Sequence, residues 1–279
     1  RLDIKKKVFE QVEQFRTPGT LVTSNTSGIP IHMMAEGRSE DFRKHFCGTH
    51  FFNPPRYLRL LEIIPTADTK QDIVDFLMEY GALYLGKTTV LCKDTPAFIG
   101  NRVGVYSMLA LTHLVEKMDL TVEEVDKYTG PAMGHPKSAT FRTADVVGLD
   151  TMNHVIKTLQ DNLSIKTDPF YDNFATPSVL AKLLEMGNLG QKTGAGFYKK
   201  QGRDILRFDA AAQEYVTGGG KADEVVGRML KKPAAERLKL LRNAEGAEPR
   251  FLWAIIRDQL HYSAVHLHDV AETARDIDL

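Results

Sequence analysis

The pattern of apolar and polar positions changes character near residue 94. Before that point, short apolar stretches alternate with segments whose apolar residues recur at helical spacing, which is typical of α/β folds. The predicted helices cover 1–16, 29–35 and 69–84, and the predicted strands cover 21–23, 45–52, 58–64 and 88–92. We therefore expect residues 1–94 to form part of an α/β domain.

After Pro96 the pattern is helical. Apolar residues from Ile99 to Leu114 recur every three or four positions, which predicts a long core helix over 97–118. Further helices are predicted to about residue 186, followed by a glycine-rich loop and a short extended stretch at Phe197-Tyr198. A helical domain is therefore expected over 95–215.

The remaining residues, 216–279, are expected to form a linker and an incomplete second helical repeat. The linker is predicted at 216–223, because Gly218-Gly219-Gly220 favours a flexible chain, and the tail is predicted to be helical from Ala222. The motif Pro96-x-Phe98-Ile99 recurs as Pro249-x-Phe251-Leu252. Such recurrence indicates a duplicated unit.

A second pair of motifs supports this duplication. Val125-Asp126, after the first long helix, has the counterpart Ile277-Asp278. Because the second copy stops there, we expect it to leave apolar surface that favours a homodimer. The face expected to need a partner consists of Leu252, Ile256, Leu260, Ala264, Leu267 and Ala271. A non-catalytic helical dimerisation module is thus one functional hypothesis.

Charge and composition exclude several partners. Lys+Arg and Asp+Glu both total 36, so there is no basic excess of the kind that nucleic-acid binding requires. No apolar run approaches the ~20 residues that span a bilayer, and the first residues lack the apolar core of a signal peptide. Cys47 and Cys92 lie in apolar surroundings, which indicates buried free thiols in a reducing cytoplasm and no metal site.

Two residues of opposite chemistry stand out within predicted strands. Glu62 lies inside the apolar run Leu60–Ile64, where a carboxylate is costly unless it is paired or faces water from an edge strand. If the chain reverses at the Pro54-Pro55 loop, antiparallel pairing places His50 opposite Glu62. A carboxylate facing an imidazole fixes its tautomer and raises its basicity, as a general base requires.

Two further polar features are candidates. The turn Ser24-Asn25-Thr26-Ser27 follows a predicted strand, at the position where α/β folds bind ligands, although it could be simple turn chemistry. Asn101 falls early in an otherwise apolar helix and could donate a hydrogen bond.

Taken in order, the motifs resemble those of the NAD-dependent L-3-hydroxyacyl-CoA dehydrogenases of fatty-acid β-oxidation. The resemblance covers residues 1 to about 200, and the tail resembles the second helical domain of the larger, multifunctional members. It is carried by Ser24–Ser27, Gly48-x-His50-Phe51-Phe52-Asn53-Pro54, Glu62-Ile63-Ile64, Lys93-Asp94-Thr95-Pro96-x-Phe98-Ile99-x-Asn101-Arg102, Val147–Asp150 and Lys192-Thr193-Gly194-x-Gly196-Phe197-Tyr198.

The resemblance implies a fold, a cofactor and roles for particular residues. The fold would be a Rossmann-type NAD-binding domain followed by helical domains like the C-terminal domain of 6-phosphogluconate dehydrogenases. His50 would be the general base, Glu62 would orient it, and Ser27 and Asn101 would bind oxygens of the acyl-CoA substrate. The residues that would contact NAD are Lys5, Ser27, Asn53 and Lys192.

The sequence also departs from the family pattern. It has no Gly-x-Gly-x-x-Gly turn after a strand, which would hold the cofactor pyrophosphate, so we expect an incomplete domain that binds NAD weakly. Met133-Gly134-His135-Pro136 replaces the family's Met-Gly-Pro and leaves the acyl chain length open. A Ser27-His50-Glu62 hydrolase triad is a remote alternative, because Ser27 lacks a Gly-x-Ser-x-Gly elbow.

Overall fold

A computed structural model describes residues 1–219 and 223–279 and divides the chain into two compact units. The first unit contains residues 1–104, 161–163 and 262–279, and the second contains 105–160 and 164–261. Residues 262–279 thus belong to the unit that contains the N-terminal sheet, and the unit limits do not follow the expected boundaries at 94 and 215.

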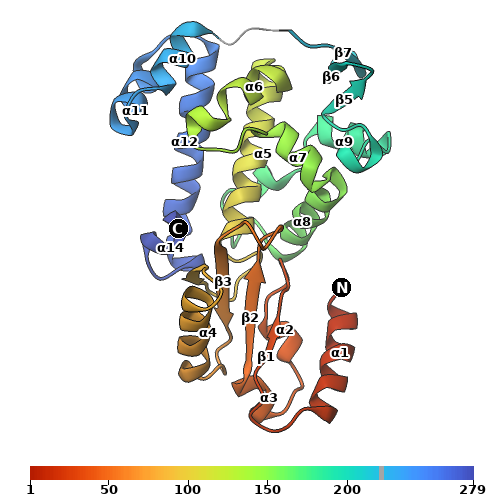
Figure 1. Ribbon diagram of the computed structural model, residues 1–279, viewed down its shortest axis with the longest axis vertical. Helices are drawn as coiled ribbons and strands as arrows, with labels where there is room; N and C mark the ends of the chain where they lie inside the picture. The colour runs from red at the N-terminus through yellow and green to blue at the C-terminus, as the bar shows by residue number, and fades with distance from the viewer. Residues whose placement is uncertain (220–222) are drawn as a thin grey trace. The chain divides into compact units, whose positions relative to one another are not determined.

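The first unit is built on a four-stranded sheet, which confirms the predicted α/β class (Figure 1). The strands lie in the order of the chain: β1 (Val22–Ser24), β2 (Phe46–Phe51), β3 (Leu60–Pro65) and β4 (Thr88–Leu91). The outer pairs β1–β2 and β3–β4 are parallel, and the central pair β2–β3 is antiparallel. The reversal at the Pro54-Pro55 loop therefore takes place as predicted.

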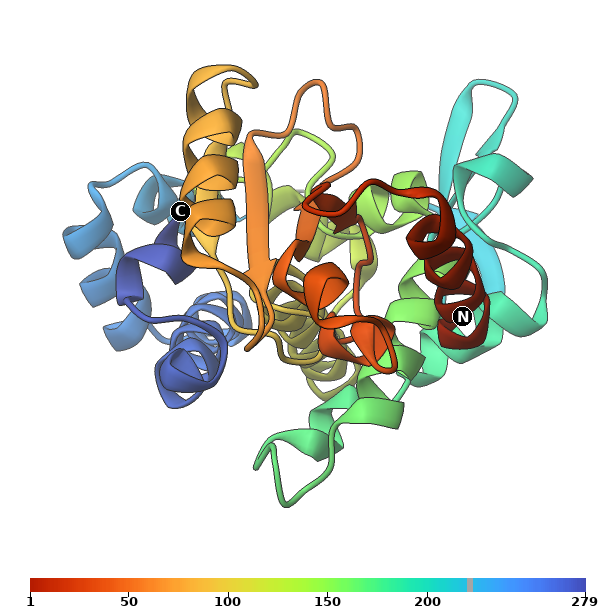
Figure 2. The same ribbon diagram turned by 90° about the horizontal axis from the view of Figure 1, so that it is seen from below.

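Each face of this sheet has its own apolar layer. Side chains of neighbouring strand residues point to opposite faces. Phe46 and Ile64 belong to the layer beneath α1 (Leu2–Phe15), α2 (His32–Ala35) and α3 (Glu40–Lys44), whereas Cys47 and Ile63 pack with α4 (Gln71–Leu83). Figure 2 shows α4 and α1 on opposite sides of the strands. The helix α3, which Ser39 caps, was not predicted.

The second unit contains mostly helices, as the apolar periodicity predicts. The long helix predicted over 97–118 is α5 (Gly100–Met118), whose residues up to Gly104 belong to the first unit. It begins at Gly100 because Ala97 and Phe98 have positive φ angles. The other helical elements are α6 (Val122–Tyr128), η1 (Pro131–Met133), α7 (Phe141–Val147), α8 (Leu149–Asn162), η2 (Tyr171–Phe174), α9 (Ser178–Glu185), η3 (Gln191–Thr193), α10 (Glu224–Leu230) and α11 (Ala234–Asn243).

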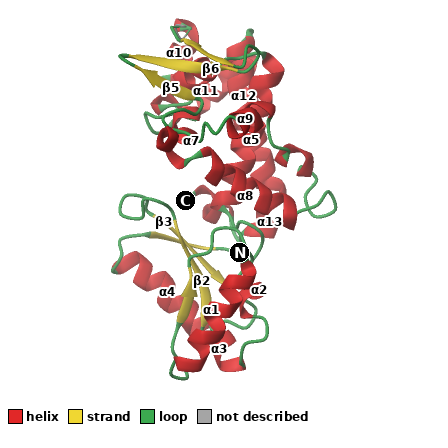
Figure 3. Cartoon of the chain, turned by 90° about the vertical axis from the view of Figure 1, so that its right-hand side faces the viewer, coloured by secondary structure: helices red, strands yellow, loops and turns green. Residues whose placement is uncertain are grey.

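The helical domain expected over 95–215 also contains strands that were not predicted beyond Phe197-Tyr198. An antiparallel sheet of β5 (Tyr198–Gln201), β6 (Asp204–Asp209) and β7 (Glu214–Thr217) lies in this region (Figure 3). These strands are short, and most residues of β5 are exposed. The sequence of β5 therefore lacks the apolar alternation by which half-buried strands are recognised, and in β6 the alternation is confined to Leu206 and Phe208.

The tail is helical as predicted, and it shares a capping box with the first predicted copy of the repeat. It contains α12 (Ala247–Val265), α13 (Leu267–Val270) and α14 (Ala274–Asp278). A capping box starts α6 at Thr121, and another starts α14 at Thr273. The duplication itself stays a prediction. Gly220 and Ala222 of the expected linker lie outside the described residues.

The expectation that one face of the tail needs a partner is only partly met. Leu252 and Ala271 are fully buried within the chain, and Leu267 packs against the core layer of the first sheet. Leu260 is 59% exposed. The chain therefore covers the two ends of this face by itself, because the tail turns after α12 and packs against the sheet domain. Across the described residues, no helix is both long and apolar enough to cross a bilayer.

Candidate active site

The predicted pairing of His50 with Glu62 is confirmed. The two residues are direct partners in the register of β2 and β3, and Nδ1 of His50 lies 2.6 Å from Oε2 of Glu62. Both side chains are buried, Glu62 completely and His50 to within 3%. The carboxylate therefore does not face water from an edge, and the imidazole is its partner.

The second carboxylate oxygen of Glu62 is held by the start of α5. The backbone N–H groups of Ile99 and Gly100 donate to Oε1 of Glu62, at 3.0 and 2.7 Å. These donors are the orphan N–H groups of a helix N-terminus, which carry partial positive charge and favour an anion. Sequence reasoning missed them, because backbone groups carry no side-chain signal.

Close packing makes a glycine necessary at the first residue of α5. A Cβ atom at position 100 would lie 2.6 Å from Cζ of Phe52. The ring of Phe52 in turn packs on the imidazole of His50, with centroids 4.5 Å apart. Gly100 thus lets the helix N-terminus reach Glu62 while Phe52 shields the pair.

A strained backbone segment completes the apolar wall. Ala97 and Phe98 have φ angles of 62° and 54°, which L-residues other than Asn and Asp rarely adopt. The fully buried ring of Phe98 lies with its centroid 5.8 Å from that of His50. Strain of this kind is concentrated at functional sites, and here it places an aromatic ring beside the imidazole.

The arrangement determines which nitrogen of His50 can accept a proton. An ionised carboxylate only accepts hydrogen bonds, so Nδ1 of His50 carries the hydrogen and Nε2 carries the lone pair. Among the described residues no hydrogen bond involves Nε2. The pair is therefore suited to general-base catalysis at Nε2, with Glu62 stabilising the imidazolium that forms.

The polar turn after β1 divides into a structural half and an exposed half. Ser24 and Thr26 are buried, and Oγ of Ser24 donates to Oγ1 of Thr26 over 3.1 Å. Oδ1 of Asn25 accepts from the N–H of Phe51 at 2.9 Å, which joins this turn to the end of β2. Ser27 is exposed, and its carbonyl accepts from Nδ2 of Asn101 at 2.8 Å.

The other predicted ligand-binding residues occupy separate positions. Asn53 is exposed and follows β2, next to the strand that leads to Ser27, so both residues follow the carboxyl ends of neighbouring parallel strands. Lys5 is half-buried on α1. Lys192 belongs to the second unit, where its Nζ lies 2.5 Å from Oδ2 of Asp150.

The geometry disfavours a serine hydrolase. A catalytic serine needs its hydroxyl within hydrogen-bond reach of the base. No hydrogen bond joins the Ser27 side chain to His50 within residues 1–219 and 223–279. Nothing in the described chain therefore activates the Ser27 hydroxyl.

The two cysteines are buried and free, as predicted. Burial raises the pKa of the Cys47 thiol to about 12. It also raises the pKa of Cys92, and the nearby carboxylate of Glu62 adds to this effect. Neither thiol is a nucleophile at neutral pH, because the thiolate is the reactive form.

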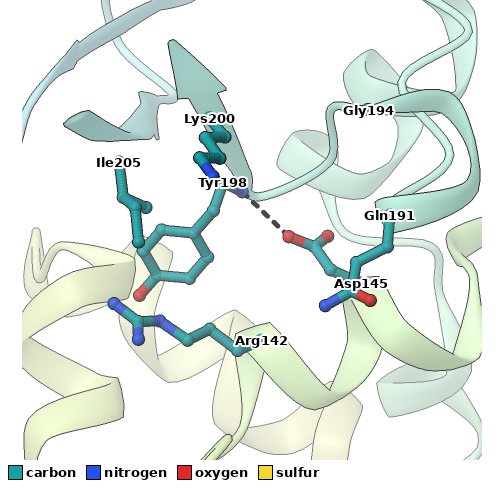
Figure 4. A pocket seen from close by; sticks show the side chains of 7 residues that line it. All are labelled: Arg142, Asp145, Gln191, Gly194, Tyr198, Lys200 and Ile205. Carbon is teal, nitrogen blue, oxygen red and sulfur yellow. Dashed lines mark hydrogen bonds between the residues drawn. The ribbon is translucent and has the colours of Figure 1, made fainter. Parts of the chain in front are cut away.

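The motif that ends in Gly196-Phe197-Tyr198 has a structural role in the second unit. The Asp145 carboxylate accepts from the N–H of Phe197 at 2.8 Å and from the N–H of Tyr198 at 2.9 Å. Figure 4 shows the second of these bonds. A Cβ atom at position 196 would lie 2.0 Å from Oδ1 of Asp145, so only glycine fits. Burial raises the pKa of Asp145 to about 6.

A cavity of about 380 Å³ lies beside this carboxylate, between α7, η3 and the β5–β6 strands (Figure 4). It is lined by Arg142, Asp145, Gln191, Gly194, Tyr198, Lys200 and Ile205. Both oxygens of Asp145 are already occupied by backbone donors. The hydrogen bonds from Phe197 and Tyr198 to Asp145 therefore hold β5 against α7.

A sheet domain with a buried imidazole–carboxylate pair at a strand end has the arrangement of an enzyme that uses a side-chain general base. Residues 1–95 match the profile of the 3-hydroxyacyl-CoA dehydrogenase, NAD binding domain, and residues 98–200 match that of the 3-hydroxyacyl-CoA dehydrogenase, C-terminal domain.

Individual relatives agree. A probable 3-hydroxyacyl-CoA dehydrogenase of Bacillus subtilis is 44% identical over 99% of this chain and 35% of its own length. A putative fatty acid oxidation complex trifunctional enzyme of Rickettsia felis is 31% identical over 71% of this chain and 28% of its own length. The crystal structure of M. tuberculosis FadB2 aligns with a TM-score of 0.64 and 31% identity, over 72% of this chain and 68% of that one.

The chain belongs to the NAD-dependent 3-hydroxyacyl-CoA dehydrogenase family. It has the Rossmann-like NAD-binding domain and the helical C-terminal domain of that family. It spans about a third of the Bacillus relative and 28% of the Rickettsia relative.

The residues around His50 fit one end of the family's cofactor. The exposed Ser27 and Asn53 follow two neighbouring parallel strands, at the sheet edge where nucleotides bind in α/β folds. The pyrophosphate needs a glycine-rich turn between a strand and a helix, which the sequence lacks. The fit is therefore to the nicotinamide end of NAD.

Proposed function

We propose that this chain carries the proton-transfer half of an NAD-dependent oxidation of L-3-hydroxyacyl-CoA to 3-oxoacyl-CoA. The observation that carries the proposal is the buried pair of His50 and Glu62, with 2.6 Å between Nδ1 and Oε2. The oxidation removes a proton from the 3-hydroxyl group and a hydride from C3. Nε2 of His50 accepts the proton, and NAD, when bound, accepts the hydride.

Glu62 has two tasks in this proposal. Its Oε2 atom fixes the Nδ1–H tautomer of His50, so that Nε2 faces the reaction as a base. Its negative charge then stabilises the imidazolium, and the N–H groups of Ile99 and Gly100 hold the carboxylate in place.

Ser27 and Asn101 are proposed to bind the substrate oxygens. The Asn101 amide donates to the carbonyl of Ser27, so the two residues form one polar group. Ser27 and Asn53 are proposed to contact the nicotinamide side of NAD. Lys5 and Lys192 remain proposed cofactor contacts, and they rest on the family resemblance alone.

We propose that the 279 residues by themselves bind NAD weakly. The sequence lacks the glycine-rich turn whose backbone N–H groups would hold the pyrophosphate. Calorimetric titration of the chain with NAD is expected to show no saturable binding at micromolar concentrations. Saturation in that range would contradict this part of the proposal.

The finer functional assignments are also proposals. A role in fatty-acid β-oxidation is supported by the similarity to the putative fatty acid oxidation complex enzyme of Rickettsia felis. A cytoplasmic location is supported by two buried free thiols. A homodimer is supported by the exposed Leu260 on α12, and light scattering that gives only a monomer at high concentration would remove it.

The experiment that tests the proposed reaction uses the full-length protein. NADH formation at 340 nm is measured with L-3-hydroxybutyryl-CoA, and with the D isomer as the matched control. The proposal predicts turnover with the L isomer only. No NADH from either isomer, or labelling by a serine-directed organophosphonate, would contradict it.

A further inference from the structure

Arg102 is a buried cation two residues after the N–H groups that hold Glu62. Its side chain is 3% exposed. An arginine is always charged, and a buried charge is costly unless polar groups compensate it. The groups found on Arg102 come from a segment 160 residues further along the chain.

Two buried side chains at the end of the tail contact this guanidinium. Nε of Arg102 donates to the hydroxyl of Tyr262 at 3.0 Å, and Nη2 lies 3.4 Å from Nδ1 of His266. Tyr262 is fully buried and His266 is 1% exposed. The same Nδ1 atom of His266 lies 2.8 Å from Oδ2 of Asp269, which adds a carboxylate to the group.

The tail is fastened to the sheet domain at a second position. The N–H of Lys93 donates to the carbonyl of Val270 at 2.9 Å, and its Nζ donates to the carbonyl of His268 at 2.8 Å. Val270 and Ala271 belong to the same core layer as Phe98. Residues 262–271 therefore pack along the segment that leads into α5.

Four consecutive residues connect the tail to the candidate active site. The N–H groups of Ile99 and Gly100 hold Glu62, the side chain of Asn101 holds Ser27, and the side chain of Arg102 contacts the tail. Gly100, Asn101 and Arg102 lie in the first turn of α5. Ile99 directly precedes the helix, and its carbonyl accepts from the N–H of Val103 at 2.9 Å, so the four residues share one hydrogen-bonded backbone segment. A shift of Arg102 therefore shifts the donors that orient Glu62.

We propose that Tyr262 and His266 are positioning residues for the pair of His50 and Glu62, and that they act through Arg102. This inference rests on the proposed function. The Bacillus relative is similar over 99% of the chain, tail included, whereas the Rickettsia similarity covers 71%. Positioning by the tail is thus expected in relatives whose similarity includes the tail, such as the Bacillus protein.

The test combines turnover with a signal from the hydrogen bond itself. In the full-length protein, kcat and KM for L-3-hydroxybutyryl-CoA are compared for wild type, Tyr262→Phe, His266→Ala and His266→Asn. In each, the downfield proton resonance of the His50 Nδ1–H group is recorded by NMR, and its absence in His50→Gln assigns it.

A matched control loosens the tail without touching Arg102. Glu272→Gln removes the ion pair between Glu272 and Lys93, whose atoms lie 3.2 Å apart at the surface. It is expected to leave kcat and the resonance unchanged. Thermal unfolding of every variant shows whether the protein remains folded.

The inference predicts that Tyr262→Phe and His266→Ala each lower kcat about tenfold and leave KM within about twofold. Losses of this size are typical when a residue that supports a metal ligand through a hydrogen bond is removed. It also predicts a shifted, faster-exchanging resonance in both, and values nearer wild type in His266→Asn, whose amide can replace Nδ1. Unchanged kcat and resonance in both variants, with turnover abolished by His50→Gln, would overturn the inference and leave the proposed function standing. Full turnover in His50→Gln would instead refute the proposed function, and the resonance alone would then decide whether the tail positions the pair.

Discussion

Oε1 of Glu62 lies 2.7 Å from the backbone nitrogen of Gly100, so a strand carboxylate caps the helix that starts the next segment of the fold. The Glu62 side chain thus contacts both the candidate base, His50, and the start of α5. Its Oε2 atom orients His50, and its Oε1 atom satisfies donors that would otherwise be buried without partners. Different substitutions of Glu62 can therefore separate its role in catalysis from its role in stability.

Glu62→Gln and Glu62→Ala are predicted to differ in stability. The glutamine keeps an oxygen that can accept from Ile99 and Gly100, whereas the alanine leaves both N–H groups buried and unsatisfied. Each such loss costs about 1–3 kcal/mol, so Glu62→Ala should unfold at lower urea concentration than Glu62→Gln. Both variants should lose turnover, since neither has the charge that stabilises the imidazolium. Equal unfolding midpoints would show that Glu62 does not support the start of α5.

Two glycines of one helix provide a comparison of packing at the site. Gly100→Ala would place a Cβ atom 2.6 Å from Cζ of Phe52, whereas a Cβ atom at Gly104 has no heavy atom within 4 Å. We predict that Gly100→Ala loses about 1–3 kcal/mol through overpacking. Gly104→Ala should gain up to about 1 kcal/mol from helix propensity. Chemical denaturation measures both, and equal effects would contradict the close approach of α5 to Phe52.

The buried Asp145 predicts a pH dependence of stability. Burial raises its pKa to about 6 in the folded state, above its usual 3.8, so the folded protein binds the proton more tightly than the unfolded chain. Its contribution is fully present below pH 3.8 and is lost as the pH rises through about 6, with a total of about 3 kcal/mol. Relative to Asp145→Asn, the wild type should therefore lose stability between pH 4 and 7.

The control for this prediction is Asp150→Asn. A hydrogen bond from Lys192 lowers the pKa of Asp150, so its contribution has the opposite sign and is lost as the pH falls. Urea unfolding at several pH values separates the two slopes. A wild-type curve parallel to that of Asp145→Asn would show that the carboxyl group has an ordinary pKa.

The candidate pair was predictable from sequence, whereas its surroundings were not. A carboxylate and an imidazole at symmetric positions about Arg56, directly after Pro54-Pro55, are visible in the sequence, and strand register follows from the loop. The partners of Glu62 Oε1 are backbone groups 37 and 38 residues away, which no side-chain pattern reveals.

Two other features show the same limit. The contact of Arg102 with Tyr262 joins positions 160 residues apart, and both side chains are of types common on helices. The sheet of β5, β6 and β7 was missed because β5 is exposed and polar and the apolar alternation of β6 is limited to Leu206 and Phe208. In each case tertiary contacts, and not local propensity, determine the structure.

Thiol chemistry gives a prediction for the native fold. Burial raises the pKa of Cys47 to about 12 and also raises that of Cys92, so neither forms a thiolate at pH 8. Ellman's reagent should label neither cysteine in the folded protein and both in urea. Rapid labelling of the native protein, assigned with a Cys47→Ser variant, would contradict the buried placement of the sheet core.

The measurement that tests the central claim most directly is the oxidation of NADH by acetoacetyl-CoA in the full-length protein, for wild type and His50→Gln. The glutamine preserves the size and polarity of the side chain but cannot transfer the proton. The account predicts that kcat falls by a factor on the order of 10² to 10⁴ while KM changes little. A variant with wild-type kcat would show that His50 is not the acid–base group, and that its pairing with Glu62 serves only the fold.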